Sequence, residues 1–153
     1  MARILLVDPE APVRALTRRI LVMDGHEVVD VGTGGEALAL LTQPFDAMLV
    51  DVAVPDLDGN DLLDAIRLTP CGFAAPIIVT SAPSDAQGAI REARAGVLDR
   101  VDKPFGFGTI QAAVRRALES TPKQLDDLRV IRSIAADAYG SAHRLREDSR
   151  LLT

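Results

Sequence analysis

The most constraining feature of this sequence is the alternation of short apolar runs with segments of helical periodicity. Each run is too short for a buried helix, and the residues after it carry apolar side chains three or four positions apart, which indicates an amphipathic helix. Such strand–helix units predict one α/β domain, with a parallel sheet covered by helices on both faces. The expected strands are 3–8, 27–31, 45–51, 75–82 and 97–102, and the expected helices are 10–24, 34–43, 60–68, 84–96 and 108–120.

Right-handed crossovers make this a doubly wound sheet, and we expect the flavodoxin-like strand order 2-1-3-4-5. Ligands of such folds bind beyond the carboxyl ends of the strands. In the first helix, the apolar side chains fall on one face. That face is formed by Val13, Leu16, Ile20 and Met23.

Composition limits the functional classes. The chain has 153 residues, 48% of them hydrophobic, which is enough for a real core, and its net charge of −5 argues against a general nucleic-acid binder. The single cysteine, Cys71, excludes an internal disulfide and a zinc–cysteine cluster. The N-terminal apolar run is too short for a signal peptide, and no run approaches the ~20 residues of a membrane span. We therefore expect a cytoplasmic protein without membrane contact.

Three expected strands end in the dipeptide Val-Asp, at Asp8, Asp51 and Asp102. Strands 1 and 3 are neighbours in the expected order, so Asp8 and Asp51 should face each other at one edge of the sheet. Two carboxylates in a partly dry site repel each other, and a divalent cation removes that repulsion. Carboxylates, main-chain carbonyls and water suit Mg²⁺. Asp8 taken alone is equally consistent with a helix N-cap.

Two other residues are expected at the same edge. Lys103, in the segment DKPFG, should extend over Asp51 as a fixed cation, where it can pair with that carboxylate or bind an anion added to it. Ser81 closes the fourth strand and offers a hydroxyl, although a helix-capping role explains a serine there equally well.

Together these residues resemble the receiver domain of two-component response regulators. The motifs occur in order as VDPE (7–10), LVDVAVPDLDG (49–59), PIIVTSA (76–82) and DKPF (102–105). The ordered set is far more specific than any single motif. The resemblance covers residues 2–119, so we expect a receiver domain over 1–119 and a helical extension over 120–153 that acts without an attached output domain.

The resemblance implies a phosphorelay signalling protein rather than an enzyme. Asp51 would accept a phosphoryl group from a histidine kinase or a phosphotransfer protein, and Lys103 and Ser81 would contact its oxygens. The carboxylates of Asp8 and Asp51 and the main-chain carbonyl of Ala53 would bind Mg²⁺. The phosphorylated protein would then act through contact with a downstream protein target.

Two positions depart from the family pattern. Pro9 stands where the family usually has a second acid, the direct metal ligand, so Mg²⁺ binding should be weak, with Glu10 as a candidate replacement. Arg100 stands where the family usually has an aromatic residue, and arginine keeps its charge and needs a partner when buried. These departures leave open a pseudo-receiver that docks partners without being phosphorylated.

The segment 120–153 begins with TPKQ, a good helix start, and continues with apolar residues three or four apart from Leu128 to Leu145. This stripe fits a helix packed on its own receiver or the interface of a homodimer. The segment is too short for a winged-helix domain, so direct DNA binding is not expected. Flavodoxin and haloacid-dehalogenase enzymes fit less well, because DPEAP (8–12) would repel a bound phosphate and Glu10 stands where such phosphatases need a second aspartate.

Overall fold

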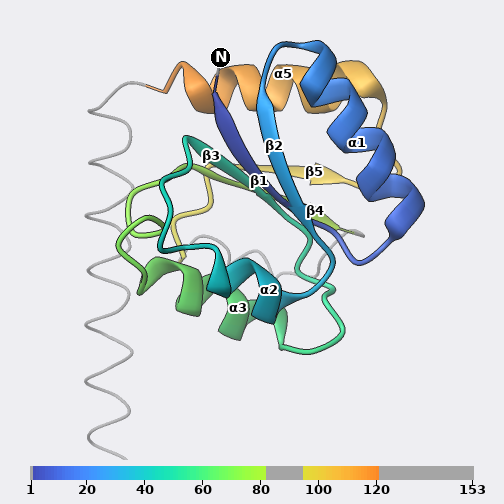
Figure 1. Cartoon of the computed structure of the whole chain (residues 1–153). Helices are drawn as coiled ribbons and strands as arrows, with labels where there is room; N and C mark the ends of the chain where they lie inside the picture. The colour runs from blue at the N-terminus through green and yellow to red at the C-terminus, as the bar shows by residue number, and fades with distance from the viewer. Residues whose placement is uncertain (1, 82–94, 121–153) are drawn as a thin grey trace, which may run out of the picture.

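The computed structural model describes residues 2–81 and 95–120. Its parallel strands form one sheet in the order β2-β1-β3-β4-β5, which confirms the predicted order (Figure 1). The strands are β1 (Arg3–Val7), β2 (Glu27–Val31), β3 (Ala47–Val50), β4 (Ile77–Ser81) and β5 (Asp99–Asp102). The described helices are α1 (Ala11–Met23), α2 (Gly34–Ala39), α3 (Gly59–Arg67) and α5 (Phe107–Leu118).

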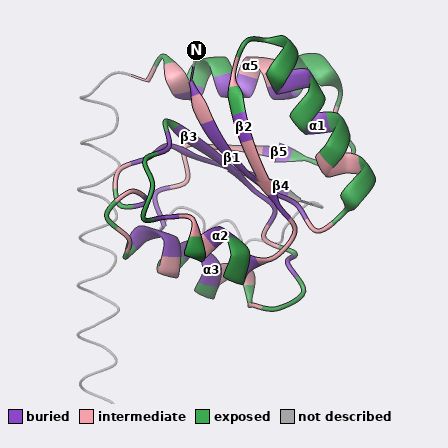
Figure 2. Cartoon of the chain, in the orientation of Figure 1, coloured by how far each residue is buried: buried purple, intermediate pink, exposed green. Residues whose placement is uncertain are grey.

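Helices cover both faces of the sheet, with α1 and α5 on one side and α2 and α3 on the other (Figure 1). Alternate side chains of each strand point to opposite faces and enter different cores. In β1, Leu5 and Val7 pack in the core under α2 and α3, whereas Ile4 and Leu6 pack in the core under α1 and α5. Figure 2 shows the central strands buried along almost their whole length, as the unbroken apolar runs predict.

The buried face of α1 does not coincide with the apolar face of its sequence pattern. Thr17, Ile20 and Leu21 are buried, whereas Leu16 is 46% exposed and Met23 is 77% exposed. The buried stripe is therefore rotated by about one residue from the apolar pattern. Thr17 tolerates burial because its hydroxyl donates a hydrogen bond to the Val13 carbonyl at 2.8 Å.

Most predicted elements agree with the structure to within a few residues, and the largest difference is in α2. The helix expected over 34–43 ends at Ala39. The amides of Leu40, Leu41 and Gln43 bond to carbonyls three residues earlier, so the helical hydrogen-bond pattern is replaced by tight turns. None of the helices within 2–81 and 95–120 is long and apolar enough to cross a membrane.

Two predicted elements cannot be compared in full. The helix predicted over 84–96 lies outside the described residues except at its last two positions. The predicted helical extension also lies outside them from residue 121 onward.

Candidate functional site

The site begins where β1 and β3 end side by side. Val7 is in register with Val50, so Asp8 and Asp51 follow at the same level of the sheet. The Asp51 amide donates to the Val7 carbonyl at 2.8 Å and the Asp8 amide to Val31 of β2 at 3.0 Å, which extends the sheet hydrogen bonding into the site. Both side chains are 2% exposed. The sheet thus places two buried carboxylates together, as predicted.

Lys103, directly after β5, brings a cation between these carboxylates. Its Nζ lies 2.7 Å from Asp51 Oδ2, 2.9 Å from Asp8 Oδ2 and 3.4 Å from Glu10 Oε1. The Lys103 side chain is only 14% exposed, so these ion pairs are poorly screened by water. One ammonium group therefore contacts three carboxylates. The peptide bond from Lys103 to Pro104 is cis.

The pKa values of this cluster reflect burial and pairing. Burial raises the pKa of the Asp8 carboxyl above its ordinary value, and this outweighs the opposite effect of its bonds to Lys103 and to the Glu10 amide. Burial by itself would lower the pKa of Lys103, but its bonds to Asp51 and Asp8 outweigh burial and raise it. Lys103 is therefore protonated at neutral pH, and acid neutralises Asp8 more easily than an ordinary aspartate because its pKa is raised.

Hydrogen bonds fix the loop after Asp51 at several points. The Asp51 Oδ1 atom accepts a hydrogen bond from the Ala53 amide at 2.9 Å. The Asp56 carboxylate accepts from the amides of Gly34 and Gly35 at the start of α2, both at 2.9 Å, and these bonds, first from Gly35 and then from Gly34, hold the pKa of Asp56 below its ordinary value. A fixed loop keeps the main chain at Ala53 in a defined place beside Asp51.

The turn after β1 is built without a second acid. Pro9 supplies no oxygen from its side chain, and the amide of Glu10 donates to Asp8 Oδ1 at 2.8 Å. The Glu10 side chain is 58% exposed, and it reaches the cluster only through its contact with Lys103. Pro9 therefore leaves Asp8 as the only buried carboxylate that this turn contributes.

The donors at this edge suit a hard cation. Mg²⁺ is held in proteins by one or two carboxylates and keeps several of its waters, so Asp8, Asp51 and a main-chain carbonyl make an adequate set. Within residues 2–81 and 95–120, no group of three or more His, Cys, Asp or Glu side chains has the arrangement of a metal site.

The family of this chain follows from comparison with known proteins. The family model for the response regulator receiver domain matches residues 4–115. The chain belongs to the response regulator receiver family. It is 34% identical over 119 residues to the transcriptional regulatory protein KdpE of Mycobacterium tuberculosis, covering 77% of this chain and 51% of that protein. It is 32% identical over 131 residues to CpxR of Escherichia coli, covering 83% of this chain and 55% of that protein.

Solved structures of receivers share the fold. The chemotaxis response regulator CheY4 of Vibrio cholerae superposes with a TM-score of 0.72 at 27% identity, over 77% of this chain and 99% of that chain. The receiver domain of the sensor histidine kinase PA1611 of Pseudomonas aeruginosa superposes with a TM-score of 0.70 at 29% identity, over 78% of this chain and 98% of that chain. That structure was solved with a magnesium ion coordinated in its active-site cleft. This receiver chain spans about half the length of the curated relatives it matches.

Two residues named from the sequence, Asp102 and Arg100, lie away from the cluster in the described structure. Asp102 ends β5 but is 55% exposed and pairs with Arg100 at 2.8 Å, so its strand end points away from the pair of buried carboxylates. Arg100 has thus found the partner that its charge requires. Ser81 ends β4, and its side chain lies outside the described part of the structure.

Two residues that contact the site loops were not predicted. Arg14 donates to the main-chain carbonyl of Asp8, and Asp56 binds the start of α2. Both act on main-chain groups across a turn or between distant segments, and such contacts leave no periodic pattern. The Gly34-Gly35 pair was the one local signal, because a helix that starts with two glycines has amides open to an outside acceptor.

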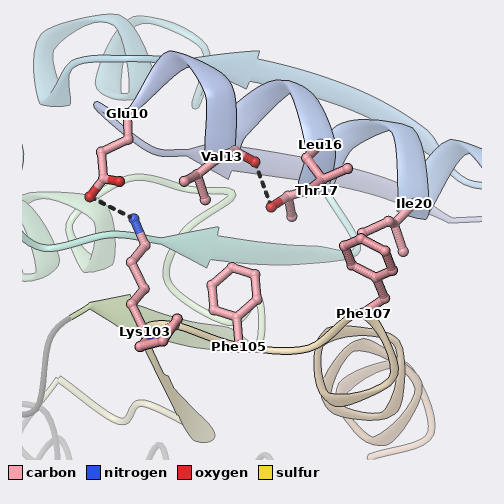
Figure 3. A pocket seen from close by; sticks show the side chains of 9 residues that line it. Glu10, Val13, Leu16, Thr17, Ile20, Lys103, Phe105 and Phe107 are labelled. Carbon is pink, nitrogen blue, oxygen red and sulfur yellow. Dashed lines mark hydrogen bonds and ion pairs between the residues drawn. The ribbon is translucent and has the colours of Figure 1, made fainter.

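An apolar groove of about 310 Å³ adjoins the receiver site (Figure 3). Glu10 and Lys103 lie at one end of it, and α1 and the segment after β5 form its walls. Leu16 on one wall is 46% exposed and Phe107 on the other is 53% exposed. The groove is further lined by Val13, Thr17, Ile20, Pro104 and Phe105.

Proposed function

We propose that this receiver accepts a phosphoryl group on Asp51 and passes the signal on by protein–protein contact. The observation that carries the proposal is the placement of Lys103 Nζ 2.7 Å from Asp51 and 2.9 Å from Asp8. A buried carboxylate beside a fixed cation can act as a nucleophile whose charged product is neutralised in place.

The proposed transfer needs little covalent chemistry from the protein. An oxygen of Asp51 attacks the phosphorus of a phosphohistidine in line, the P–N bond breaks, and the histidine nitrogen leaves with the bonding electron pair. Asp51 becomes an acyl phosphate. Lys103 exchanges its bond to the carboxylate for one to a phosphoryl oxygen, and Ser81 would supply a hydroxyl to another.

We further propose that Asp8, Asp51 and the carbonyl of Ala53 hold Mg²⁺ during this transfer, with Glu10 as a candidate fourth contributor. When bound, Mg²⁺ would neutralise charge on the transferring phosphoryl group. The single buried acid of the first turn supports weak binding, because Pro9 offers no ligand in place of the acid usual in this family.

The groove supports a docking place for the phosphodonor, either a histidine kinase or a phosphotransfer protein. It is apolar along α1 and ends at Lys103, so a helix seated in it would bring a histidine side chain toward Asp51. The exposed side chains of Leu16 and Phe107 offer apolar area on both walls. The proposal also includes a downstream protein target, which rests on the family. A homodimer rests on the apolar stripe from Leu128 to Leu145, and a cytoplasmic location rests on the short apolar runs of the sequence.

Treatment of the chain with a small phosphodonor tests the proposal. We expect an acid-stable phosphoprotein that forms with Mg²⁺ and is lost when Mg²⁺ is chelated. The Asp51→Asn variant should lose all of it, because an amide is not a nucleophile toward phosphorus. Intact-mass spectrometry measures the product. If no Asp51-dependent phosphoprotein forms at high Mg²⁺ or with a histidine kinase, the phosphoacceptor role is wrong.

Pro9 favours the alternative function, a pseudo-receiver that docks partners without phosphorylation. A Pro9→Asp variant separates the two, since it restores a carboxylate in the first turn. We expect it to bind Mg²⁺ roughly tenfold more tightly, measured by titration of amide chemical shifts. Pro9→Ala, which removes the ring without adding an oxygen, is the control. An equal gain in both variants would mean that the proline ring, and not the missing ligand, limits binding.

A further inference from the structure

Arg14 of α1 reaches back over the start of its own helix to the end of β1. One of its terminal nitrogens, NH1, donates to the main-chain carbonyl of Asp8 at 2.7 Å. Its Nε donates to Asp30 Oδ2 of β2 at 3.2 Å. The guanidinium therefore links β1, α1 and β2 at the edge of the sheet where Asp8 lies.

The structure leaves room for this guanidinium at Gly32. A Cβ atom at position 32 would lie 2.8 Å from Arg14 NH1 and 3.8 Å from the Asp8 carbonyl oxygen. A contact of 2.8 Å is shorter than a carbon and a nitrogen can approach, so any side chain at this position would force the guanidinium of Arg14 to shift. Gly32 thus leaves the space that the guanidinium occupies, and the Asp30 carboxylate accepts its hydrogen bond. We call this place the seat of Arg14.

With Arg14 in this seat, each polar atom of Asp8 has a partner. The amide donates to Val31, the carbonyl accepts from Arg14, Oδ1 accepts from the Glu10 amide and Oδ2 pairs with Lys103. The next residue is Pro9, which has no N–H to contribute. Arg14 is therefore the side chain that fixes the peptide group between Asp8 and Pro9, and through it the direction of the Asp8 carboxylate.

We infer that Arg14 is a positioning residue for the cation site, acting through the main chain of Asp8. The inference rests on the proposed function for the identity of the cation. Because Pro9 leaves Asp8 as the one buried acid of this turn, the geometry of that acid has a large effect on how well the turn binds a metal. Fixing a ligand from outside the coordination shell typically changes metal affinity by about tenfold or more.

The charge of Arg14 and its positioning role predict opposite effects of its removal on Mg²⁺ binding. Arg14 is positive, so its removal would strengthen Mg²⁺ binding if only its charge mattered. If it positions Asp8, its removal weakens binding. Arg18 is the matched control, because its Nε lies 3.3 Å from the same Asp30 carboxylate and no bond joins it to Asp8.

The test titrates Mg²⁺ into the full chain and its variants and also measures hydrogen exchange of the Glu10 amide without metal. Arg14→Gln should bind Mg²⁺ about tenfold more weakly and exchange the Glu10 amide several times faster. Arg14→Lys keeps the charge but cannot bridge Asp8 and Asp30, and Gly32→Ala displaces the guanidinium, so both should show the same changes. Arg18→Gln should show neither.

Equal effects of Arg14→Gln and Arg18→Gln, or tighter binding in both, would overturn the inference, and so would full Mg²⁺ affinity in Gly32→Ala. If Arg14→Gln fails to fold, Arg14→Lys and Gly32→Ala decide the question. The exchange measurement needs neither metal nor phosphoryl group. A chain that is never phosphorylated on Asp51 would thus refute the proposed function while the role of Arg14 is still measured.

Discussion

Replacing Lys103 with methionine is expected to lower the free energy of unfolding at neutral pH by about 3–5 kcal/mol. Lys103 is the cation that contacts both Asp8 and Asp51, whose side chains are 2% exposed. Removing one partner from a buried ion pair leaves the other charge without compensation, and here two carboxylates would be left facing each other. The loss should appear in urea unfolding followed by circular dichroism.

The pH dependence of this loss has a definite sign. The pKa of Asp8 is already raised by burial, so its ionisation opposes folding: the favourable contribution is complete below the unfolded pKa and disappears as the pH rises through the folded value. Without Lys103, the ionisation of Asp8 opposes folding more strongly. The variant should be closest to the wild type near about pH 4 and furthest from it above about pH 7.

A second substitution controls for simple loss of packing. Adding Asp8→Asn to Lys103→Met removes one of the repelling charges and should recover part of the lost stability. Millimolar Mg²⁺ should also stabilise Lys103→Met more than the wild type, because the metal no longer competes with the ammonium group. If the double variant is no more stable than Lys103→Met, and the loss is the same at both ends of the pH range, uncompensated charge is not the cause.

Replacing Arg67 with methionine is expected to destabilise the fold by about 3–5 kcal/mol without altering the cluster of Asp8, Asp51 and Lys103. Arg67, at the end of α3, is 5% exposed. Its guanidinium donates to four main-chain carbonyls at 2.7–2.9 Å, those of Gly72, Ala75, Ala95 and Gly96. Methionine fills similar space but leaves these buried acceptors without their charged donor.

Arg116→Met is the matched control, since Arg116 is 62% exposed and pairs with Asp99 at 2.8 Å. That pair is screened by water, so its loss should change the free energy of unfolding by about 0.5 kcal/mol or less. Arg67→Lys should also be destabilised, because one ammonium group cannot reach carbonyls spread over two segments. Similar urea midpoints for Arg67→Met and Arg116→Met would show that the buried hydrogen bonds contribute little.

Periodicity predicted the fold because the elements are repetitive. Unbroken apolar runs can only be strands buried on both faces, and five strand–helix units allow few topologies once crossovers are right-handed. Periodicity did not locate the buried face of α1, because Met23 belongs to the apolar face of the pattern and is nevertheless 77% exposed. The pattern carries no information about how a helix rotates over its neighbours, and a single hydrogen bond from Thr17 is enough to make a polar residue acceptable in the buried stripe.

By itself, the sequence determined the strand order and the meeting of Asp8, Asp51 and Lys103, because strand ends in a parallel sheet are brought together by topology alone. Only the tertiary structure decided which side chains fix the segments around these residues and in the rest of the fold. The bonds of Arg14 to Asp8, of Asp56 to α2 and of Arg67 to four carbonyls join side chains to main-chain groups. Every residue offers the same main-chain donors and acceptors, so such contacts become visible only when the folded chain brings particular ones within reach.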